Sequence, residues 1–345
     1  MDGASIHVRI RMNDRQRPNI IDGRSPHEEY RKNGKEAVAK GLTSEMKLNK
    51  IGPLLLLVVV VLICGRGFFR YFGNRHDTLS SSTVMKADIA VPKVLEKPVV
   101  ADKLQYPKGH LELFNLYHSK ILRKSFNCKQ MRRFGNAGDG GWEMCVDEPY
   151  TLKKGNCLVY SFGIANDYSF DDHVAKDLNC EIHAFDPSIG QKDYKRGNYI
   201  QFHNLGVSGT DFTNKNGWKL MTVDSIMKSL GHENRIIDYF KIDVESSEWD
   251  TLAQMMKAGT VDRVKQIGIE YHINNAYKGN AKEEEKHMIE IRRNLAIFDN
   301  LEAYGFKIYH FHTNMAAPTY VSSLTGKTER CCQEIYYVNT RFIEN

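Results

Sequence analysis

Short apolar segments alternate with amphipathic segments of helical period from Cys157 onward, and this alternation is the strongest constraint on the fold. The expected strands are 157–162, 181–185, 199–205, 236–244, 264–271, 306–311 and 334–338. The expected helices are 167–178, 222–230, 248–257 and 283–304. The pattern predicts an α/β protein with a mostly parallel seven-stranded sheet, helices on both faces and an antiparallel hairpin at one edge.

A further helix is expected ahead of this region. Its apolar residues recur at helical spacing, which indicates an amphipathic helix that packs on the sheet. These residues are Leu111, Phe114, Tyr117, Ile121 and Leu122. The folded domain is therefore expected to cover residues 111–345.

The N-terminal part of the chain contains an unbroken apolar run, LLLLVVVVLIC, at 54–64. Extended to 51–72, it reaches the ~20 residues that cross a bilayer, provided that Arg66 and Arg70 place their charges at the interface. Residues 51–72 are therefore predicted to be a transmembrane signal anchor, with a buried core helix as the alternative. If translation starts at Met46, the run is instead the apolar region of a signal peptide.

The segments on either side of this run are polar. Residues 1–50 lack sustained periodicity and are expected to be a disordered tail. Residues 73–110 contain Ser, Pro and Lys and are expected to be a stem or linker. An anchor and a cleaved signal both place the large domain in the ER or Golgi lumen or outside the cell. The protein is therefore expected to be a type II single-pass membrane protein or a secreted protein.

The positive charge of the chain is concentrated at its N-terminus. The whole chain carries +6, while residues 1–50 hold 11 Lys/Arg and 7 Asp/Glu and so carry +4 (11 − 7). The remainder carries only +2 (6 − 4). This distribution gives no basic face for nucleic acid, so no nucleic-acid partner is expected.

Six cysteines follow the apolar run, and an even number in an exported domain permits disulfides. A Cys128–Cys145 disulfide is predicted around the Gly-rich segment. Cys157 and Cys180 begin neighbouring strands and are expected to be buried thiols. The chain has no CxxC motif, which argues against a zinc ribbon.

Ligands of open α/β sheets bind where parallel strands end, and the first strand ends at Ser161-Phe162-Gly163. The GxGxxG fingerprint is missing, which counts against a nicotinamide dehydrogenase. The second strand ends at Asp186, 23 residues after Gly163 (186 − 163). A carboxylate at about this spacing accepts hydrogen bonds from a ribose diol. A helix N-cap is the alternative role for Asp186.

A Gly-rich loop precedes the first strand and contains Asp139-Gly140-Gly141. Its glycines permit a close approach of the backbone to a ligand. An ordinary turn beside a buried Trp142 is the alternative.

The sharpest local signal is Lys241-Ile242-Asp243-Val244-Glu245. Asp243 and Glu245 are two residues apart, so in an extended chain they face the same side. Two carboxylates are costly to bury unless Lys241, a metal or a substrate hydroxyl pairs with them. The alternative is a helix start capped by Ser246 or Ser247, which does not account for Asp243.

The fifth strand ends at His272, which is a candidate general base at the same edge of the sheet. A structural histidine is the alternative. Asp243, Glu245 and His272 are therefore the candidate catalytic residues.

Six motifs in order resemble the methyltransferase-like domain of animal membrane or secreted proteins. They are Phe134-Gly135, 139–145, 160–164, 185–188, 241–245 and 269–272. The Lys-Ile-Asp-Val-Glu stretch is also similar to FkbM-type O-methyltransferases, which have Gly where this chain has Ser246. The resemblance covers about residues 111–340.

The resemblance implies a class I, Rossmann-like fold that binds S-adenosylmethionine (SAM). The adenosyl ribose is expected at Asp186, and the methionine end near Ser161, Gly163 and the loop 139–141. The expected function is O-methylation of a sugar hydroxyl or similar small polar acceptor in the secretory pathway. The alternatives are a non-catalytic membrane-anchored module and, third, a nucleotide-sugar or nicotinamide enzyme. A divalent-metal requirement and the oligomeric state stay open.

Overall fold

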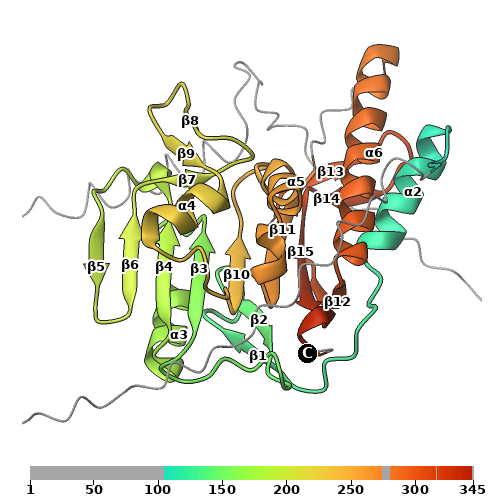
Figure 1. Cartoon of the computed structure of the whole chain (residues 1–345). Coiled ribbons are helices and arrows are strands. Elements are labelled where there is room, and N and C mark those ends of the chain that lie inside the picture. Colours follow the sequence, from blue (N-terminus) through green and yellow to red (C-terminus); the bar gives the residue numbers. More distant parts are fainter. Residues whose placement is uncertain (1–104, 274–279, 316, 344–345) are drawn as a thin grey trace, which may run out of the picture. The chain divides into compact units, whose positions relative to one another are not determined.

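The computed structural model describes residues 105–273, 280–315 and 317–343 (Figure 1). The predicted tail 1–50, the predicted anchor 51–72 and most of the predicted stem lie outside these residues. Within the described part of the chain, no helix is both long enough and apolar enough to cross a membrane.

One eight-stranded sheet forms the centre of the domain, in the order β12-β15-β11-β10-β3-β4-β6-β5 (Figure 1). Its strands are β3 (Leu158–Phe162), β4 (Glu181–Phe185), β5 (Tyr194–Arg196), β6 (Ile200–His203), β10 (Tyr239–Ile242), β11 (Gln266–His272), β12 (Phe306–His312) and β15 (Cys332–Asn339). Neighbours from β6 to β11 pair in parallel. β15 is antiparallel to both β11 and β12. The α/β class and the antiparallel pair at one edge are confirmed.

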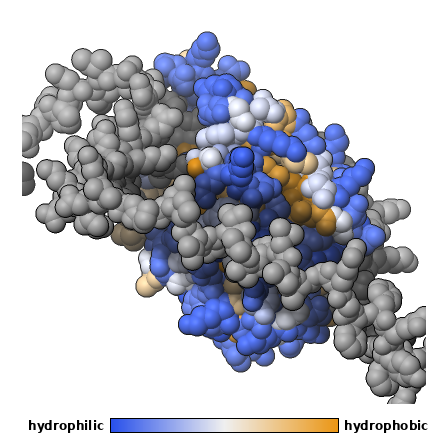
Figure 2. All heavy atoms as spheres, turned by 90° about the vertical axis from the view of Figure 1, so that its left-hand side faces the viewer, coloured by the Kyte–Doolittle hydropathy of each residue, from blue (hydrophilic) through white to orange (hydrophobic). Residues whose placement is uncertain are grey.

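The eighth strand, β5, corrects the predicted count of seven. β5 pairs antiparallel with β6 at the far edge of the sheet and has the sequence Tyr-Lys-Arg. Three residues with two exposed cations give no apolar alternation to recognise. Such charge is typical of an edge strand that must not pair with another chain. Seen from this edge, the described surface is mostly hydrophilic, with one hydrophobic strip (Figure 2).

Helices cover both faces of the sheet because alternate strand residues point to opposite sides. On β3, Leu158, Tyr160 and Phe162 belong to one core cluster and Val159 to the other. The helices on the first face are α2 (His110–Ile121), α4 (Val223–Leu230), α5 (Glu248–Ala258) and α6 (Ala281–Ala303). On the second face lie α3 (Ser169–Leu178) and the hairpin of β1 (Met131–Phe134) and β2 (Trp142–Cys145).

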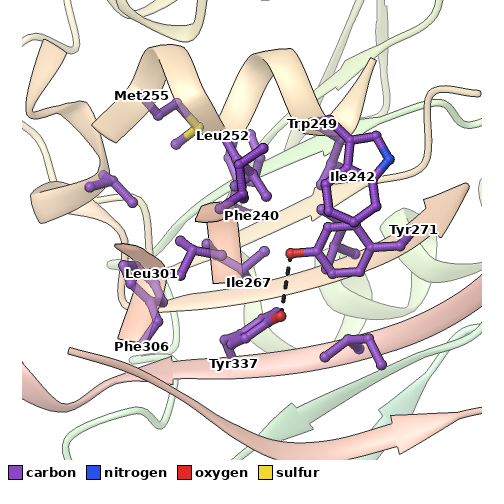
Figure 3. Packing of buried hydrophobic residues seen from close by; sticks show 14 of the residues in the cluster. Phe240, Ile242, Trp249, Leu252, Met255, Ile267, Tyr271, Leu301, Phe306 and Tyr337 are labelled. Atoms are coloured by element: carbon purple, nitrogen blue, oxygen red, sulfur yellow. Dashed lines mark hydrogen bonds between the residues drawn. The ribbon is translucent and has the colours of Figure 1, made fainter. Parts of the chain in front are cut away.

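The larger core lies between α5, α6 and the centre of the sheet (Figure 3). Trp249 stacks on Tyr271 with ring centroids 4.4 Å apart. The Tyr271 hydroxyl lies 3.3 Å from that of Tyr337 on β15. This packing fixes β11 relative to the start of α5.

The predicted face of α2 is partly wrong. Leu111 and Leu122 are 42% and 39% exposed, whereas Leu113 is fully buried beside Phe114 and Tyr117. The helix begins at His110 and ends at Ile121, so Leu122 lies beyond it.

Three short β units were not predicted. They are the β1–β2 hairpin, the sheet of β7 (Gly206–Val207), β9 (Lys219–Met221) and β8 (Phe212–Thr213), and the hairpin of β13 (Thr319–Val321) and β14 (Thr328–Arg330). Strands of two to four residues are too short for a recognisable period.

Disulfides join three pairs of cysteines. The predicted Cys128–Cys145 bond is present, with a Cα–Cα distance of 5.9 Å. Cys157 and Cys180 also form a disulfide, so their assignment as thiols is wrong. Leu158 pairs with Glu181 in the parallel register of β3 and β4, which places the preceding cysteines opposite each other, with Cα atoms 4.7 Å apart. The third bond joins the adjacent residues Cys331 and Cys332.

Candidate functional site

The sheet has a topological switch point between β3 and β10. From β3 the chain proceeds to β4 and β6 on one side, and later to β10 and β11 on the other. The connections therefore leave in opposite directions at the carboxyl ends of β3 and β10, where open α/β sheets bind ligands. Gly163 follows β3 and Asp243 follows β10, so both predicted residues lie at this point.

Gly163 is required by the protein's own packing. Its φ is +74°, and a Cβ here would lie 1.6 Å from the carbonyl oxygen of Asp243. Lys241 Nζ also donates to the carbonyl oxygens of Phe162 and Gly163, at 3.2 and 3.0 Å. Of the three partners considered for the two carboxylates, Lys241 thus directs its hydrogen bonds to the two strand ends and acts on Asp243 only through its charge.

Asp186 follows β4 and is 5% exposed. Its Oδ2 accepts a hydrogen bond from Ala165 N, and its Oδ1 accepts one from Ser188 N, both at 2.8 Å. The second bond caps the short helix Pro187–Ile189, so the capping role is present. A carboxylate oxygen has two lone pairs, so each can still accept a bond from a ribose hydroxyl.

The loop held by Asp186 has an unusual backbone. Ala165 and Asn166 have φ of 46° and 70°, in the left-handed region that residues with a Cβ seldom adopt. Such conformations persist only where surrounding contacts impose them, and they are concentrated at functional sites. Asp186 and the loop after β3 thus form one preorganised unit at the carboxyl edge of the sheet.

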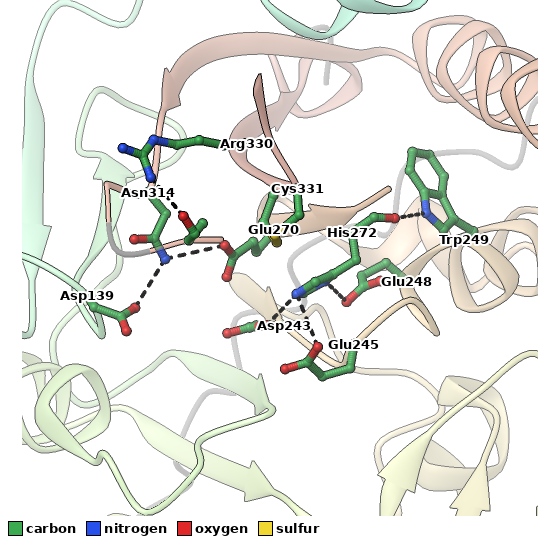
Figure 4. The surroundings of a disulfide bond; sticks show 12 residues. Asp139, Asp243, Glu245, Glu248, Trp249, Glu270, His272, Asn314, Arg330 and Cys331 are labelled. Atoms are coloured by element: carbon green, nitrogen blue, oxygen red, sulfur yellow. Dashed lines mark hydrogen bonds and ion pairs between the residues drawn. A yellow bond between two sulfur atoms is a disulfide. The ribbon is translucent and has the colours of Figure 1, made fainter. Parts of the chain in front are cut away.

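The loop between β1 and β2 holds the predicted Asp139, Gly140 and Gly141. A Cβ on Gly140 would lie 2.1 Å from Asp167 Oδ2, and one on Gly141 would lie 1.9 Å from Asn136 O. Gly141 is therefore required by a backbone contact inside the protein, and Gly140 is required by its φ of +82°. The exposed Asp139 accepts a hydrogen bond from Asn314 Nδ2 at 3.4 Å, as Figure 4 shows.

Ser161 lies inside the sheet. It is fully buried and pairs in register with Lys241 on β10. The equally buried Asp171 on α3 interacts with both. Burial raises the pKa of Asp171 to about 7, while Lys241 and Ser161 lower it. Ser161 is therefore part of a buried polar group, with Lys241 and Asp171, next to the switch point.

The carboxylates and His272 converge at the ends of β10 and β11 (Figure 4). Nδ1 of His272 lies 3.0 Å from Glu248 Oε1, on the first turn of α5. Nε2 lies 3.8 Å from Asp243 Oδ1 and 3.7 Å from Glu245 Oε2. The side chain of Glu248 is fully buried, that of His272 is 11% exposed, and that of Asp243 is 29% exposed.

Asp243 and Glu245 were expected to face the same side because they lie two residues apart in an extended chain. This reason is wrong. β10 ends at Ile242, and Glu245 and Ser246 have φ of 57° and 85°. A tight left-handed turn, and not strand alternation, brings both carboxylates toward His272. The FkbM-type O-methyltransferases, which this stretch resembles, have Gly at the position of Ser246. Glycine adopts such a positive φ without steric cost.

The ionisable residues of the cluster differ in the size and causes of their pKa shifts. Burial lowers the pKa of His272, but the hydrogen bond to Glu248 and the surrounding carboxylates raise it to about 10. Burial raises the pKa of Asp243 to about 6, while His272 and Lys241 oppose this shift. Burial also raises the pKa of Glu270 to about 9, with Asp243 adding to it. At neutral pH, the imidazole is charged and Glu270 is protonated.

Sequence reasoning missed Glu248, Glu270 and Asn314. Glu248 begins α5 and is fully buried, where it accepts a hydrogen bond from Val244 N at 2.7 Å and lies 3.0 Å from His272 Nδ1. Glu270 shares a strand face with His272, and this two-residue spacing was a usable signal. Asn314 donates to Glu270 Oε1 at 3.4 Å and comes from a distant loop, which no local pattern indicates.

One group of ligand atoms at this edge could hold a cation. Asp243, Glu248 and His272 each offer an atom, and these atoms lie within 4.8 Å of one another. Among the described residues, Glu248 Oε2 is a buried side-chain oxygen with no hydrogen-bond partner. The acidic donors suit a hard divalent cation, so the residues fit such an ion.

Comparison with known proteins agrees with this geometry. The family model described as "Methyltransferase domain" matches residues 98–324. The human "Probable methyltransferase-like protein 24" is 23% identical over 210 residues, covering 58% of this chain and 56% of that protein. The rat protein of the same name is 23% identical over 230 residues, covering 62% of each. The matches thus span less than two thirds of these relatives. From the family match, the chain belongs to the methyltransferase domain family, whose usual cofactor is SAM.

Proposed function

We propose that this protein is a SAM-dependent O-methyltransferase that acts on a sugar hydroxyl or a similar small polar acceptor in the secretory pathway. The observation that carries the proposal is the convergence of Asp243, Glu245 and Glu248 around His272 at the switch point. Methyl transfer to a hydroxyl requires that the hydroxyl lose its proton, and this cluster supplies carboxylates for that task.

The roles within the cluster follow from charge and exposure. Asp243 is partly exposed and ionised at neutral pH, so it accepts the acceptor's proton. The hydrogen bond to Glu248 and the neighbouring carboxylates raise the pKa of His272 to about 10, so at neutral pH its ring favours the protonated form and Asp243 is the better proton acceptor. His272 instead holds the Asp243 and Glu245 carboxylates in place, while Glu248 orients its ring.

The cofactor is proposed to bind across the ends of β3 and β4. Asp186 would hold the ribose hydroxyls, and the turn at Gly163 would pass close to the methionine part. When bound, SAM supplies the electrophilic methyl group. Asp139 on the opposite loop is linked through Asn314 to Glu270, so this loop would close the cofactor site against β11.

The proposed location rests on two observations. The apolar run within 51–72 is expected to anchor the chain or direct its export. The domain also contains three disulfides, which persist in oxidising compartments. The proposed partners are accordingly a glycan or small-molecule acceptor and, through 51–72, the membrane.

Calorimetry with SAM and a methyl-transfer assay on a panel of free sugars and glycans test the proposal together. We expect SAM to bind and at least one hydroxyl-bearing acceptor to be methylated. Methylation with and without a chelator determines whether Asp243, Glu248 and His272 need a divalent ion. Binding of SAM without turnover on any acceptor would favour the non-catalytic module, and no binding of SAM would reject the proposed enzyme.

A further inference from the structure

A second cluster of titratable side chains lies at the other end of β4. Glu181 is the first residue of β4, while Asp186 follows its last residue, so the two are about 16 Å apart along the strand. His183 is on the same strand. His232 follows α4, which packs on the first face of the sheet (Figure 1). The two histidines are 7% and 6% exposed, whereas the Glu181 side chain is 44% exposed and leaves a path from solvent.

Three atoms of this cluster point at one another. Glu181 Oε1 lies 3.0 Å from His183 Nε2 and 3.2 Å from His232 Nε2. All three atoms lie within 4.8 Å of one another. Ligand atoms around a tetrahedral zinc ion, with bonds of 2.0–2.1 Å, are roughly 3.3 Å apart. The two separations from Glu181 Oε1 therefore differ from this spacing by only a few tenths of an ångström.

The outer nitrogens of both histidines already have partners. His232 Nδ1 lies 2.8 Å from the hydroxyl of the buried Tyr160. His183 Nδ1 lies 2.8 Å from His203 Nε2, and His203 Nδ1 lies 3.4 Å from Asp193 Oδ2. Metal-binding histidines almost always have their second nitrogen held in this way, which fixes the ring and aims the other lone pair at the metal.

The row from Glu181 through His183 and His203 to Asp193 lacks one hydrogen. It contains three contacts between heteroatoms, but two neutral imidazoles contribute only two N–H groups. In any neutral arrangement, therefore, one of the three contacts has no hydrogen and brings two lone pairs together. A cation between Glu181 and His183 removes this conflict, because both Nδ1–H groups then donate outward.

Arg235 occupies the exposed side of the cluster. Its Nη1 lies 2.6 Å from Glu181 Oε2 and 3.1 Å from His232 Nε2. The bond to Oε2 keeps Oε1 directed at the histidines. The contact with His232 must be released when an ion binds, and the Arg235 side chain, which is 40% exposed, has room to turn outward.

We propose that Glu181, His183 and His232 bind a Zn²⁺ ion, with water as the fourth ligand. Two imidazoles and one carboxylate form a ligand set typical of zinc. The ion would fasten the segment after α4 to β4, the strand that leads to Asp186. The site is separate from the carboxyl-edge cluster, and its existence does not depend on the proposed methyl transfer.

Metal analysis of the purified full chain tests the site. The chain is stripped with a chelator, titrated with Zn²⁺, and titrated separately with Co²⁺ as a tetrahedral spectroscopic probe. We expect one tightly bound equivalent with the strong visible absorption of tetrahedral cobalt. Glu181→Gln and His232→Gln should each weaken Zn²⁺ binding by more than about 100-fold, and Tyr160→Phe by about 10- to 100-fold.

The matched control is His272→Gln, which removes a ligand atom of the candidate cation group formed with Asp243 and Glu248 at the carboxyl edge. It should leave the proposed equivalent of zinc in place. Zinc that survives Glu181→Gln but is lost in His272→Gln would overturn the proposal, as would a wild-type chain that binds no zinc. If His232→Gln does not fold, the exposed Glu181→Gln and a zinc-dependent rise in the wild-type Tm still decide the question.

Discussion

The imidazole of His272 and the carboxylate of Glu248 lie 3.0 Å apart, although they come from a strand end and a helix start 24 residues apart in sequence. The Glu248 side chain is fully buried and also accepts a hydrogen bond from Val244 N. It therefore connects the turn after β10 to the end of β11. The position of His272 against Asp243 depends on this buried carboxylate.

Asp243→Asn tests the proposed base. The substitution keeps the size of the side chain but removes its ability to take a proton. We expect kcat to fall by about 10²–10⁴-fold with near-normal SAM affinity, measured by turnover and calorimetry. Asp250→Asn, on the exposed side of α5, is the control and should retain full activity. Retention of most activity in Asp243→Asn would make the carboxylate structural.

The pH profile provides a separate test of the same residue. The pKa of Asp243 is raised to about 6, and a base acts only when ionised. The value of kcat/KM should therefore fall as pH drops below about 6, by roughly tenfold per pH unit. Asp243→Asn should abolish this limb, whereas Asp250→Asn should keep it. A limb that survives in Asp243→Asn would assign the titration to another group.

Asp186→Ala should weaken SAM binding by about 1–3 kcal/mol, because buried hydrogen-bond partners lose their acceptor. It also removes the acceptor of Ala165 N and Ser188 N, so the free energy of unfolding should fall as well. Calorimetry and urea denaturation separate the two effects. Lower stability with unchanged affinity in the folded protein would leave Asp186 with its capping role alone.

Glu270→Gln should stabilise the domain above neutral pH. The folded-state pKa of Glu270 is about 9, above its usual value of 4.5, so its contribution to stability is lost as pH rises from about 4.5 to 9. The variant should gain about 1–3 kcal/mol at pH 8 and much less at pH 5, by urea denaturation. Glu285→Gln, on the exposed surface of α6, should change stability equally little at both values.

Ser246→Gly should stabilise the turn after β10. Ser246 has a φ of 85°, where a Cβ costs about 1–2 kcal/mol, and part of that gain is offset by the greater freedom of glycine when unfolded. A net gain of about 0.5–1 kcal/mol is expected by urea denaturation. Ser247 has a φ of −76° and provides the matched control. Ser247→Gly should destabilise the protein slightly. If Ser247→Gly stabilised the protein and Ser246→Gly destabilised it, the backbone at Ser246 would not be strained.

The sequence predicted the layers of the domain because long strands and helices have clear periods. β4 matches its expected bounds, and α4 and α5 begin or end within one residue of theirs. It also placed Gly163, Asp186, Asp243 and His272 at one edge, since parallel strands end together. It missed what depends on tertiary contact, such as the burial of Glu248 at the start of α5 against His272 and the approach of Asn314. The Cys157–Cys180 bond followed from the β3–β4 register, which no local pattern specifies.

The insertion of β15 between β11 and β12 has a consequence for biosynthesis. The strand that carries Glu270 and His272 receives one of its two neighbours from residues 332–339, which are made long after it. A fragment that stops before Cys332 would leave β11 with an open row of amide and carbonyl groups, a template for aggregation. Premature termination late in the chain should therefore yield an insoluble product and not a shortened, partly active one.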